Sequence, residues 1–350
     1  MTLSHDDLRA AVARGIVTET QAAGLIALAE ARRVAKAAVG PVEEPFVLFK
    51  GFNEIFVVVG LTILFIGWVG VATLMGLDMD APAGLTTVLL SGLTVLGLAG
   101  VGRYFTTKRR MVAPSIALSI MTALTSVVLG FALLGSSFAA YSVPAVCLFV
   151  AVVMAGHYYL FRVPFSAAII AGAAYYAVFS AWTLENVFSA VRGDESAGEL
   201  GLTALTVLFG LAVFVLAMRL DLSDPQRVST RSATAFWLHV VAAPAIVNTV
   251  ALRLLADGSA WAQAVLLGFL LLIAVVAVVI DRRSFLISGA GYSVALAATL
   301  FEGGAAVAIL ILGLALVLLG AGWDRLRARL MTALPDFPGK SNLPTYGVTP

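Results

Sequence analysis

The chain has 350 residues, of which 61% are hydrophobic and only 12% charged, whereas soluble domains carry about 25% charged residues. This composition excludes a soluble globule, and the net charge of +2 is too small for a typical nucleic-acid binder. Cys147 is the only cysteine, which excludes an intramolecular disulfide and a metal site built from several cysteines.

The first 48 residues are polar and mixed in charge, and they predict a small cytoplasmic hairpin of two helices followed by a linker. Gly15 is expected to end the first helix, and Thr18-Glu-Thr-Gln21 has the pattern of a capping box that begins the second. Such a hairpin is too small to bury a core alone. It should therefore dock on the loops of the same protein, on a second subunit in a homo-oligomer, or on a partner membrane protein contacted through residues 1–40.

Apolar stretches of roughly 20 residues then recur along residues 49–329, and each is long enough to cross about 30 Å of hydrocarbon as a helix. The predicted fold class is all-α, a polytopic membrane bundle of about ten helices. The predicted spans are 54–75, 83–102, 112–135, 141–161, 165–187, 199–218, 232–255, 260–280, 284–301 and 303–323.

The distribution of the basic residues tests this order of membrane spans. With the N-terminus in the cytoplasm, 20 of the 22 Lys and Arg residues fall on the inner side, and only Arg192 and Arg253 fall outside. Both termini are therefore predicted to be cytoplasmic. Residues 330–350 contain several Pro and Gly residues and are expected to form a loosely ordered tail.

One predicted span contains the stretch F-W-L-H-V-V-A-A-P-A-I-V-N, from Phe236 to Asn248. Polar groups inside a membrane are costly, so His239 and Asn248 are candidate substrate-binding residues and Pro244 a candidate bend. His239 and Asn248 are nine residues apart, which places them about 13–14 Å apart in height and on opposite faces. A buried packing helix, with His239 hydrogen-bonded across an interface, explains the same residues.

A face of small hydroxyl residues runs along the third predicted span. Ser115, Ser119, Thr122 and Ser126 follow helical spacing, and Ser119 and Thr122 are candidates for lining a path for a polar solute. Close packing of helices through small residues accounts for the same pattern.

Three further polar residues stand near predicted helix ends. Glu185 and Glu302 could form an outer acidic mouth that attracts cations, or could be solvated ends of helices. His157 lies beside Tyr158, Tyr159 and Arg162, which is typical of an aromatic and basic belt at the membrane surface.

The stretch R-G-I-V-T-E-T-Q-A, from Arg14 to Ala22, followed by an Ala/Leu-rich helix and many spans, resembles the family of bacterial membrane proteins called domain of unknown function 2157. The similarity in sequence covers about residues 5–35. Beyond them, only the arrangement of many membrane spans is similar. It implies a bacterial source and an inner-membrane location, and it implies no activity.

The sequence contains no H-E-x-x-H, G-x-S-x-G or Walker loop, so we expect neither an enzyme nor a bound cofactor or metal. Two functions remain open. One is a transporter of a small solute or ion, which ten spans with little soluble mass favour. The other is a scaffold, assembly or regulatory subunit whose N-terminal hairpin captures a partner. An internal echo pairs L-F-R-V-P-F-S-A-A, from Leu160, with V-I-D-R-R-S-F-L-I, from Val279, and indicates repeated hairpins.

Overall fold

The computed structural model describes residues 11–12, 14–25, 27–28, 53–78, 83–192, 198–227, 229–300, 305–337 and 339–344. These residues form helices and turns, with no strand among them, so the predicted all-α bundle is confirmed. The long helices are α3 (Asn53–Asp78), α4 (Ala83–Gly102), α5 (Val112–Phe138), α6 (Ser142–Phe161), α7 (Phe165–Arg192), α8 (Gly198–Leu222), α9 (Thr230–Asp257), α10 (Ala260–Ile280), α11 (Ser284–Leu300) and α12 (Ala305–Ala321). The shorter helix α13 (Trp323–Ala333) follows them, and α4 continues into a π-helical turn, η1 (Arg103–Lys108).

Each of the ten predicted spans corresponds to one of the helices α3–α12. Among the described residues, the helices α3–α10 are long and apolar enough to cross a membrane, which makes this a multi-pass membrane protein. Helix α11 has 17 residues, or about 25 Å, and α12 is bent by 80° from α13 across a short break. By length and composition the described spans number eight, or nine with the bent pair, so ten crossings remain a prediction.

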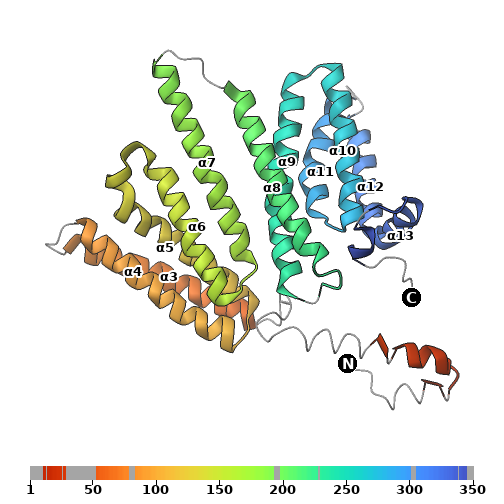
Figure 1. Ribbon diagram of the computed structural model, residues 1–350, viewed down its shortest axis with the longest axis horizontal. Coiled ribbons are helices and arrows are strands. Elements are labelled where there is room, and N and C mark those ends of the chain that lie inside the picture. The colour runs from red at the N-terminus through yellow and green to blue at the C-terminus, as the bar shows by residue number, and fades with distance from the viewer. Residues whose placement is uncertain are drawn as a thin grey trace.

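Consecutive helices pack as hairpins in two groups (Figure 1). Helices α3–α6 lie on one side and α9–α12 on the other, with α7 and α8 between them. The two groups are joined mainly where α7 packs on α9, and α8 packs along α9. The turns that lead into α5, α7, α9 and α11 share one end of the bundle, which we call the basic end because arginines gather in these turns.

The basic end shows the repeated hairpin that the sequence echo indicated. Arg162 ends α6 and Asp281 ends α10, both in the left-handed conformation with φ of 52° and 57°. The next helix begins three residues later in both cases, at Phe165 and at Ser284. The two turns therefore have the same local structure, and the second carries charged residues, Asp281 and Arg282, where the first carries Arg162 and Val163.

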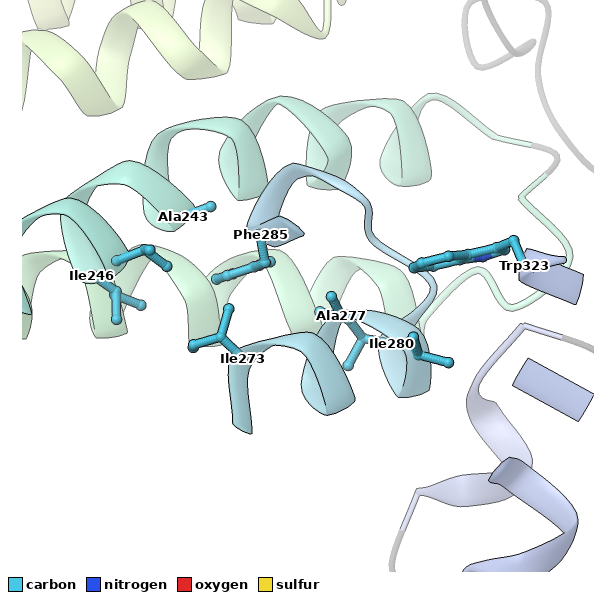
Figure 2. Packing of buried hydrophobic residues seen from close by; sticks show 9 residues of the cluster. Ala243, Ile246, Ile273, Ala277, Ile280, Phe285 and Trp323 are labelled. Atoms are coloured by element: carbon cyan, nitrogen blue, oxygen red, sulfur yellow. The ribbon is translucent and has the colours of Figure 1, made fainter. Parts of the chain in front are cut away.

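The main apolar core of the second group lies between α9, α10 and α11 near the basic end. Figure 2 shows Phe285 and Ile273 facing Ala243 and Ile246 of α9, while Trp323 of α13 lies beyond Ile280 at the end of α10. Phe285 and Trp323 are almost fully buried, with exposed fractions of 1% and 2%. This packing holds the α10–α11 turn rigidly, and the turn carries the charged residues described below.

Helix α9 continues as an unbroken α-helix through Pro244, so Pro244 does not divide it into two helices. Gly210 of α8 faces α9 just beyond the proline. A Cβ atom at Gly210 would lie 2.8 Å from Ile246 Cγ1 and 3.3 Å from the Ile246 backbone nitrogen. The absence of a side chain at Gly210 thus allows α8 and α9 to approach closely.

The described part of the N-terminal hairpin confirms the predicted capping box. The Thr18 backbone N–H donates to Gln21 Oε1 at 3.0 Å, and the Gln21 backbone N–H donates to Thr18 Oγ1 at 3.2 Å. Gly15 has a φ of 67°, and hydrogen bonds from Gly15 N to Val12 O and from Ile16 N to Ala11 O close the preceding turn. Residues 1–10 and 29–52, which complete the predicted hairpin and linker, lie outside the described residues.

The part of the expected loosely ordered tail that the structure describes, residues 330–337 and 339–344, makes ordered contacts, and residues 345–350 lie outside the described residues. Arg327 of α13 donates to the Pro344 carbonyl at 2.8 Å, and Lys340 Nζ donates to the Leu334 carbonyl at 2.7 Å. Leu343 is buried at 6% exposure. Residues 339–344 therefore fold back on α13, because Arg327 and Lys340 offer donors to chain carbonyls.

Candidate functional site

A buried cluster of three ionisable side chains lies near the basic end, where α8, α9 and the α10–α11 turn meet. Asp221 is in the last turn of α8, His239 is in α9, and Arg282 is in the turn. Asp221 Oδ2 accepts hydrogen bonds from His239 Nε2 and from Arg282 Nε, both at 2.9 Å. Arg282 Nη2 donates to Asp221 Oδ1 and, at 3.2 Å, to the Ser232 carbonyl. One carboxylate thus joins three elements.

The cluster is closed off from its surroundings. The side chains of Asp221 and Arg282 are 4% and 8% exposed, and His239 is 0% exposed. The imidazole makes edge contacts with Phe214 of α8 and Phe285 of α11, with ring centroids 5.6 and 5.9 Å away. Water is therefore excluded from His239, and its charge state depends on its few neighbours.

The hydrogen bonds fix the tautomer of His239. Since an ionised carboxylate can only accept, Nε2 must carry the proton that is donated to Asp221. The other ring nitrogen, Nδ1, is buried and has no hydrogen-bond partner among the described residues. An unsatisfied buried polar atom costs about 1–3 kcal/mol. Nδ1 is therefore the atom at which His239 could take up a second proton.

A second ion pair lies next to the cluster. Arg227, in the α8–α9 connection, donates from Nη1 to Asp281 Oδ2 at 2.8 Å and from Nη2 to the Asp281 carbonyl at 3.1 Å. Trp323 Nε1 donates to Asp281 Oδ1 at 2.7 Å, and the Arg283 guanidinium lies 5.1 Å from the centre of the Trp323 ring. These contacts attach α13 to the α10–α11 turn and so hold Arg282 in place.

The charges of the cluster nearly balance. Asp221 stands at the C-terminal end of α8, where the helix dipole disfavours a negative charge, and the two donors of Arg282 offset this. Burial lowers the pKa of the Arg227 guanidinium, the nearby Arg282 adds to that shift, and Asp281 and Asp221 oppose it. With His239 neutral, Asp221 and Arg282 cancel, and protonation of His239 would leave one net positive charge in a buried place.

A second polar cluster joins α5, α6 and α7. His157 Nδ1 lies 3.0 Å from Ser166 Oγ, and Ser166 Oγ lies 3.4 Å from Ser119 Oγ. His157 is 8% exposed, so it is a packing residue inside the bundle rather than part of a surface belt. Tyr159 is 73% exposed and lies beside the Arg162 guanidinium, and it fits the expected belt.

The predicted hydroxyl face of α5 is buried, and its hydroxyls bond mostly to their own helix. Ser119 Oγ donates to the Ser115 carbonyl and Thr122 Oγ1 to the Leu118 carbonyl, both at 2.8 Å. Ser126 bonds to the Thr122 carbonyl in the same manner. Hydroxyls bonded in this way leave the helix surface small and favour close packing.

The other predicted site residues are not brought together. Asn248 is half-buried in α9 and makes no hydrogen bond within the described chain, and neither Ser119 nor Thr122 bonds to His239. Glu185 is exposed and accepts a hydrogen bond from Tyr141 Oη at 3.3 Å, while Glu302 lies outside the described residues. Glu54 is 3% exposed and accepts from the Ala113 backbone N–H at 3.2 Å, so it caps the start of α5.

A pocket of about 280 Å³ opens beside the charged cluster, between the two groups of helices. Its walls come from the start of α5, the α6–α7 turn, the start of α9 and the Arg282 side chain. The polar residues on its wall are Ser115, Ser232 and Arg282. Its apolar residues include Ile116, Val163, Phe165, Phe236 and Trp237.

Sequence reasoning identified His239 but not its partners. Asp221 and Arg282 did not stand out in the sequence, because charged residues are common where a basic-end turn begins. The missing signal was the echo between the two turns, in which Arg282 replaces the apolar Val163. A charge at a position that is apolar in the equivalent turn could have indicated a buried partner.

Comparison with family models finds no match for this chain, and no curated protein or solved structure matches it either. The functional argument therefore depends on the sequence and on the geometry of the charged cluster.

Proposed function

We propose that this protein is a transporter of a small solute, located in a bacterial inner membrane with both termini in the cytoplasm, and that His239 couples transport to protons. The observation that carries the proposal is the buried Asp221–His239–Arg282 cluster, which joins three elements of a membrane bundle. The distribution of Lys and Arg supports the orientation. The bacterial source is supported only by the resemblance of residues 14–22 described above.

The cluster favours transport because burying charges in a membrane bundle is costly. A charged side chain costs roughly 2.5–3.5 kcal/mol at the centre of a membrane helix and less near its ends, and buried ion pairs often stabilise less than apolar residues of the same shape. A scaffold gains nothing from this cost. A transporter gains from a group whose charge changes, and we assign this role to His239 because its Nδ1 has no hydrogen-bond partner among the described residues.

The arrangement also supports movement between two states. Asp221 is shared by His239 on α9 and Arg282 in the α10–α11 turn, so a second proton on His239 strengthens one of its contacts relative to the other. A change in charge thus alters how strongly α8 is held to each neighbour. A proton shifts the population between two conformations only if it binds more tightly to one of them, and this difference in contacts would provide that.

The experiment is proton flux into liposomes that contain the full chain and a pH-sensitive dye, with a membrane potential imposed and small carboxylates, sugars, amino acids and inorganic ions supplied in turn. His239→Gln can still donate to Asp221 but cannot take up a proton, and we expect it to lose coupled flux. His157→Gln is the matched control, since it changes the other buried histidine of the described bundle. Equal loss or equal retention of flux in both variants would refute the role of His239.

The second function, a scaffold or regulatory subunit, is favoured by one observation on the N-terminal segment. Ile16, Leu25 and Leu28 are 70%, 46% and 52% exposed, so the hairpin offers an apolar surface to another protein. Purification from native membranes, beside a variant that lacks residues 1–48, tests it. A stoichiometric partner that is lost with the hairpin, together with absence of flux for every solute, would favour the scaffold over the transporter.

A further inference from the structure

We infer that the pocket between α5, the α6–α7 turn and α9 is a binding site for a small organic monocarboxylate with an apolar body. This inference deepens the proposed function by naming the class of solute, and it rests on that function only for the claim that the solute is moved. The binding site itself stands on the geometry of the pocket.

The pocket carries one positive group with a free nitrogen. Arg282 uses Nε and Nη2 for Asp221 and the Ser232 carbonyl, and its third nitrogen, Nη1, has no hydrogen bond within the described part of the chain. The side chain is only 8% exposed, and the surface that it retains lines the pocket. A guanidinium held on two nitrogens and open on the third is suited to one further carboxylate oxygen.

A second donor stands beside it. Ser232 is 8% exposed and lines the pocket, and its hydroxyl makes no hydrogen bond to any residue that the structure describes. Ser115 differs, because its hydroxyl already bonds to Thr106 Oγ1 at 2.8 Å. Both residues line the pocket, so we assign the free donors, Arg282 Nη1 and the Ser232 hydroxyl, to the two oxygens of one carboxylate.

The remaining walls of the pocket determine the size and the apolar character of the ligand. Phe165, Phe236 and Trp237 supply aromatic walls, and the Phe165 and Trp237 rings meet edge to face at 4.7 Å. A volume of about 280 Å³ lies at the lower limit of known ligand sites, which excludes large solutes. An aromatic or branched aliphatic acid of the size of benzoate fits both the volume and the walls.

Charge balance favours an anion over a neutral solute when His239 is protonated. Asp221 and Arg282 cancel when His239 is neutral, and protonation of His239 leaves one positive charge beside the pocket. One carboxylate balances that charge. The site thus links the solute to the proton through Arg282 and Asp221, without direct contact between the solute and His239.

The experiment is calorimetric titration of the purified full chain in neutral detergent with benzoate, and with benzamide as the uncharged analogue of the same shape. We expect benzoate to bind and benzamide to bind at least about tenfold more weakly, as for loss of a hydrogen bond to a charged group. Ser232→Ala should lower the affinity for benzoate by about three- to tenfold. It should leave the thermal unfolding temperature unchanged, since no hydrogen bond within the protein is lost. Equal affinity for the two probes, or unchanged affinity in Ser232→Ala, would overturn the site.

Two further arms complete the test. Ala233→Leu fills the pocket from α9 and replaces no residue of the charged cluster, and it should abolish benzoate binding in a folded protein. Phosphatidylglycerol added to the micelles tests a lipid headgroup as occupant: competition with benzoate that depends on Ser232 would overturn the assignment to a free solute. Benzoate binding without flux would retain the site and refute transport, whereas flux without benzoate binding would refute the site alone.

Discussion

Removal of the buried ion pair between Asp221 and Arg282 should cost less than removal of either member. In Asp221→Leu the Arg282 guanidinium stays buried with no carboxylate and keeps only the Ser232 carbonyl, and in Arg282→Met the carboxylate keeps only His239. Since the two side chains are 4% and 8% exposed, each single change should destabilise the fold by about 3–5 kcal/mol.

The double variant removes both charges and leaves only the His239 Nε2–H without an acceptor, which costs about 1–3 kcal/mol. If the two residues acted independently, the double variant would instead lose about 6–10 kcal/mol, the sum of the single effects. The two expectations differ by more than the uncertainty of an unfolding measurement.

The assay is equilibrium unfolding in mixed micelles of dodecyl sulfate and a neutral detergent, followed by far-ultraviolet circular dichroism. Arg283→Met is the matched control, because this neighbouring arginine is exposed and only faces the Trp323 ring, so its loss should cost about 1 kcal/mol or less. An additive double variant would refute the reasoning that Asp221 and Arg282 exist in the fold as a pair.

Three other changes test how the helices are held. Gly210→Ala should destabilise by about 1–3 kcal/mol, because the new methyl group meets the side chains of Ile246 and Ala245 in α9. Gly97→Ala, with nothing within 4 Å of its Cβ atom, should be neutral or slightly stabilising in the same unfolding assay. Trp323→Phe removes the donor to the α10–α11 turn and should lower stability by about 1.5–3 kcal/mol, while the 78% exposed Trp261→Phe should not. Glu54→Leu leaves the start of α5 without its carboxylate cap and should cost about 1–2 kcal/mol, measured as a lower unfolding temperature.

The helices could be predicted from the sequence because a lipid environment leaves few alternatives. Every backbone donor in the hydrocarbon must bond within its own helix, so an apolar run of 20 residues has only one stable form. The same holds for the capping box at Thr18 and Gln21, where both partners lie within one helical turn. In both cases the determinants are local in the sequence.

The site was not predictable in the same way, because its members lie far apart in the sequence. Asp221 and Arg282 are 61 residues apart, and their pairing depends on how α8 and the α10–α11 turn pack around α9. A charge near a helix end is usually solvated. Only the three-dimensional packing around Phe285 and Trp323 shows that Asp221 and Arg282 are buried. His157 illustrates the converse. Its aromatic and basic neighbours in the sequence indicated the membrane surface, but its side chain is buried and lies within hydrogen-bond distance of Ser166 in α7.

Proton uptake and carboxylate binding should strengthen each other, and this coupling can be measured without transport. The charged groups around His239 come from every element packed against it. They are Asp221 of α8, Arg227 of the α8–α9 connection and Arg282 of the α10–α11 turn.

An anion held by Arg282 favours the protonated form of His239, and linkage requires that a protonated His239 favours the anion equally. Benzoate is fully ionised above pH 6, since a carboxylic acid has a pKa of about 4, so any change in its affinity must come from the protein. Affinity should rise as the pH falls, by at most about tenfold per pH unit if one proton is taken up with each anion.

Titrations at several pH values from about 8 down to about 5 test the coupling, with only the ionised fraction of the benzoate counted as ligand. His239→Gln should bind benzoate with an affinity that no longer depends on pH, and His157→Gln should keep the full dependence. An unchanged pH dependence in His239→Gln would assign the proton to another group. A flat profile in the unaltered protein would show that the anion and the proton are not linked, and proton coupling through His239 would then have no physical basis.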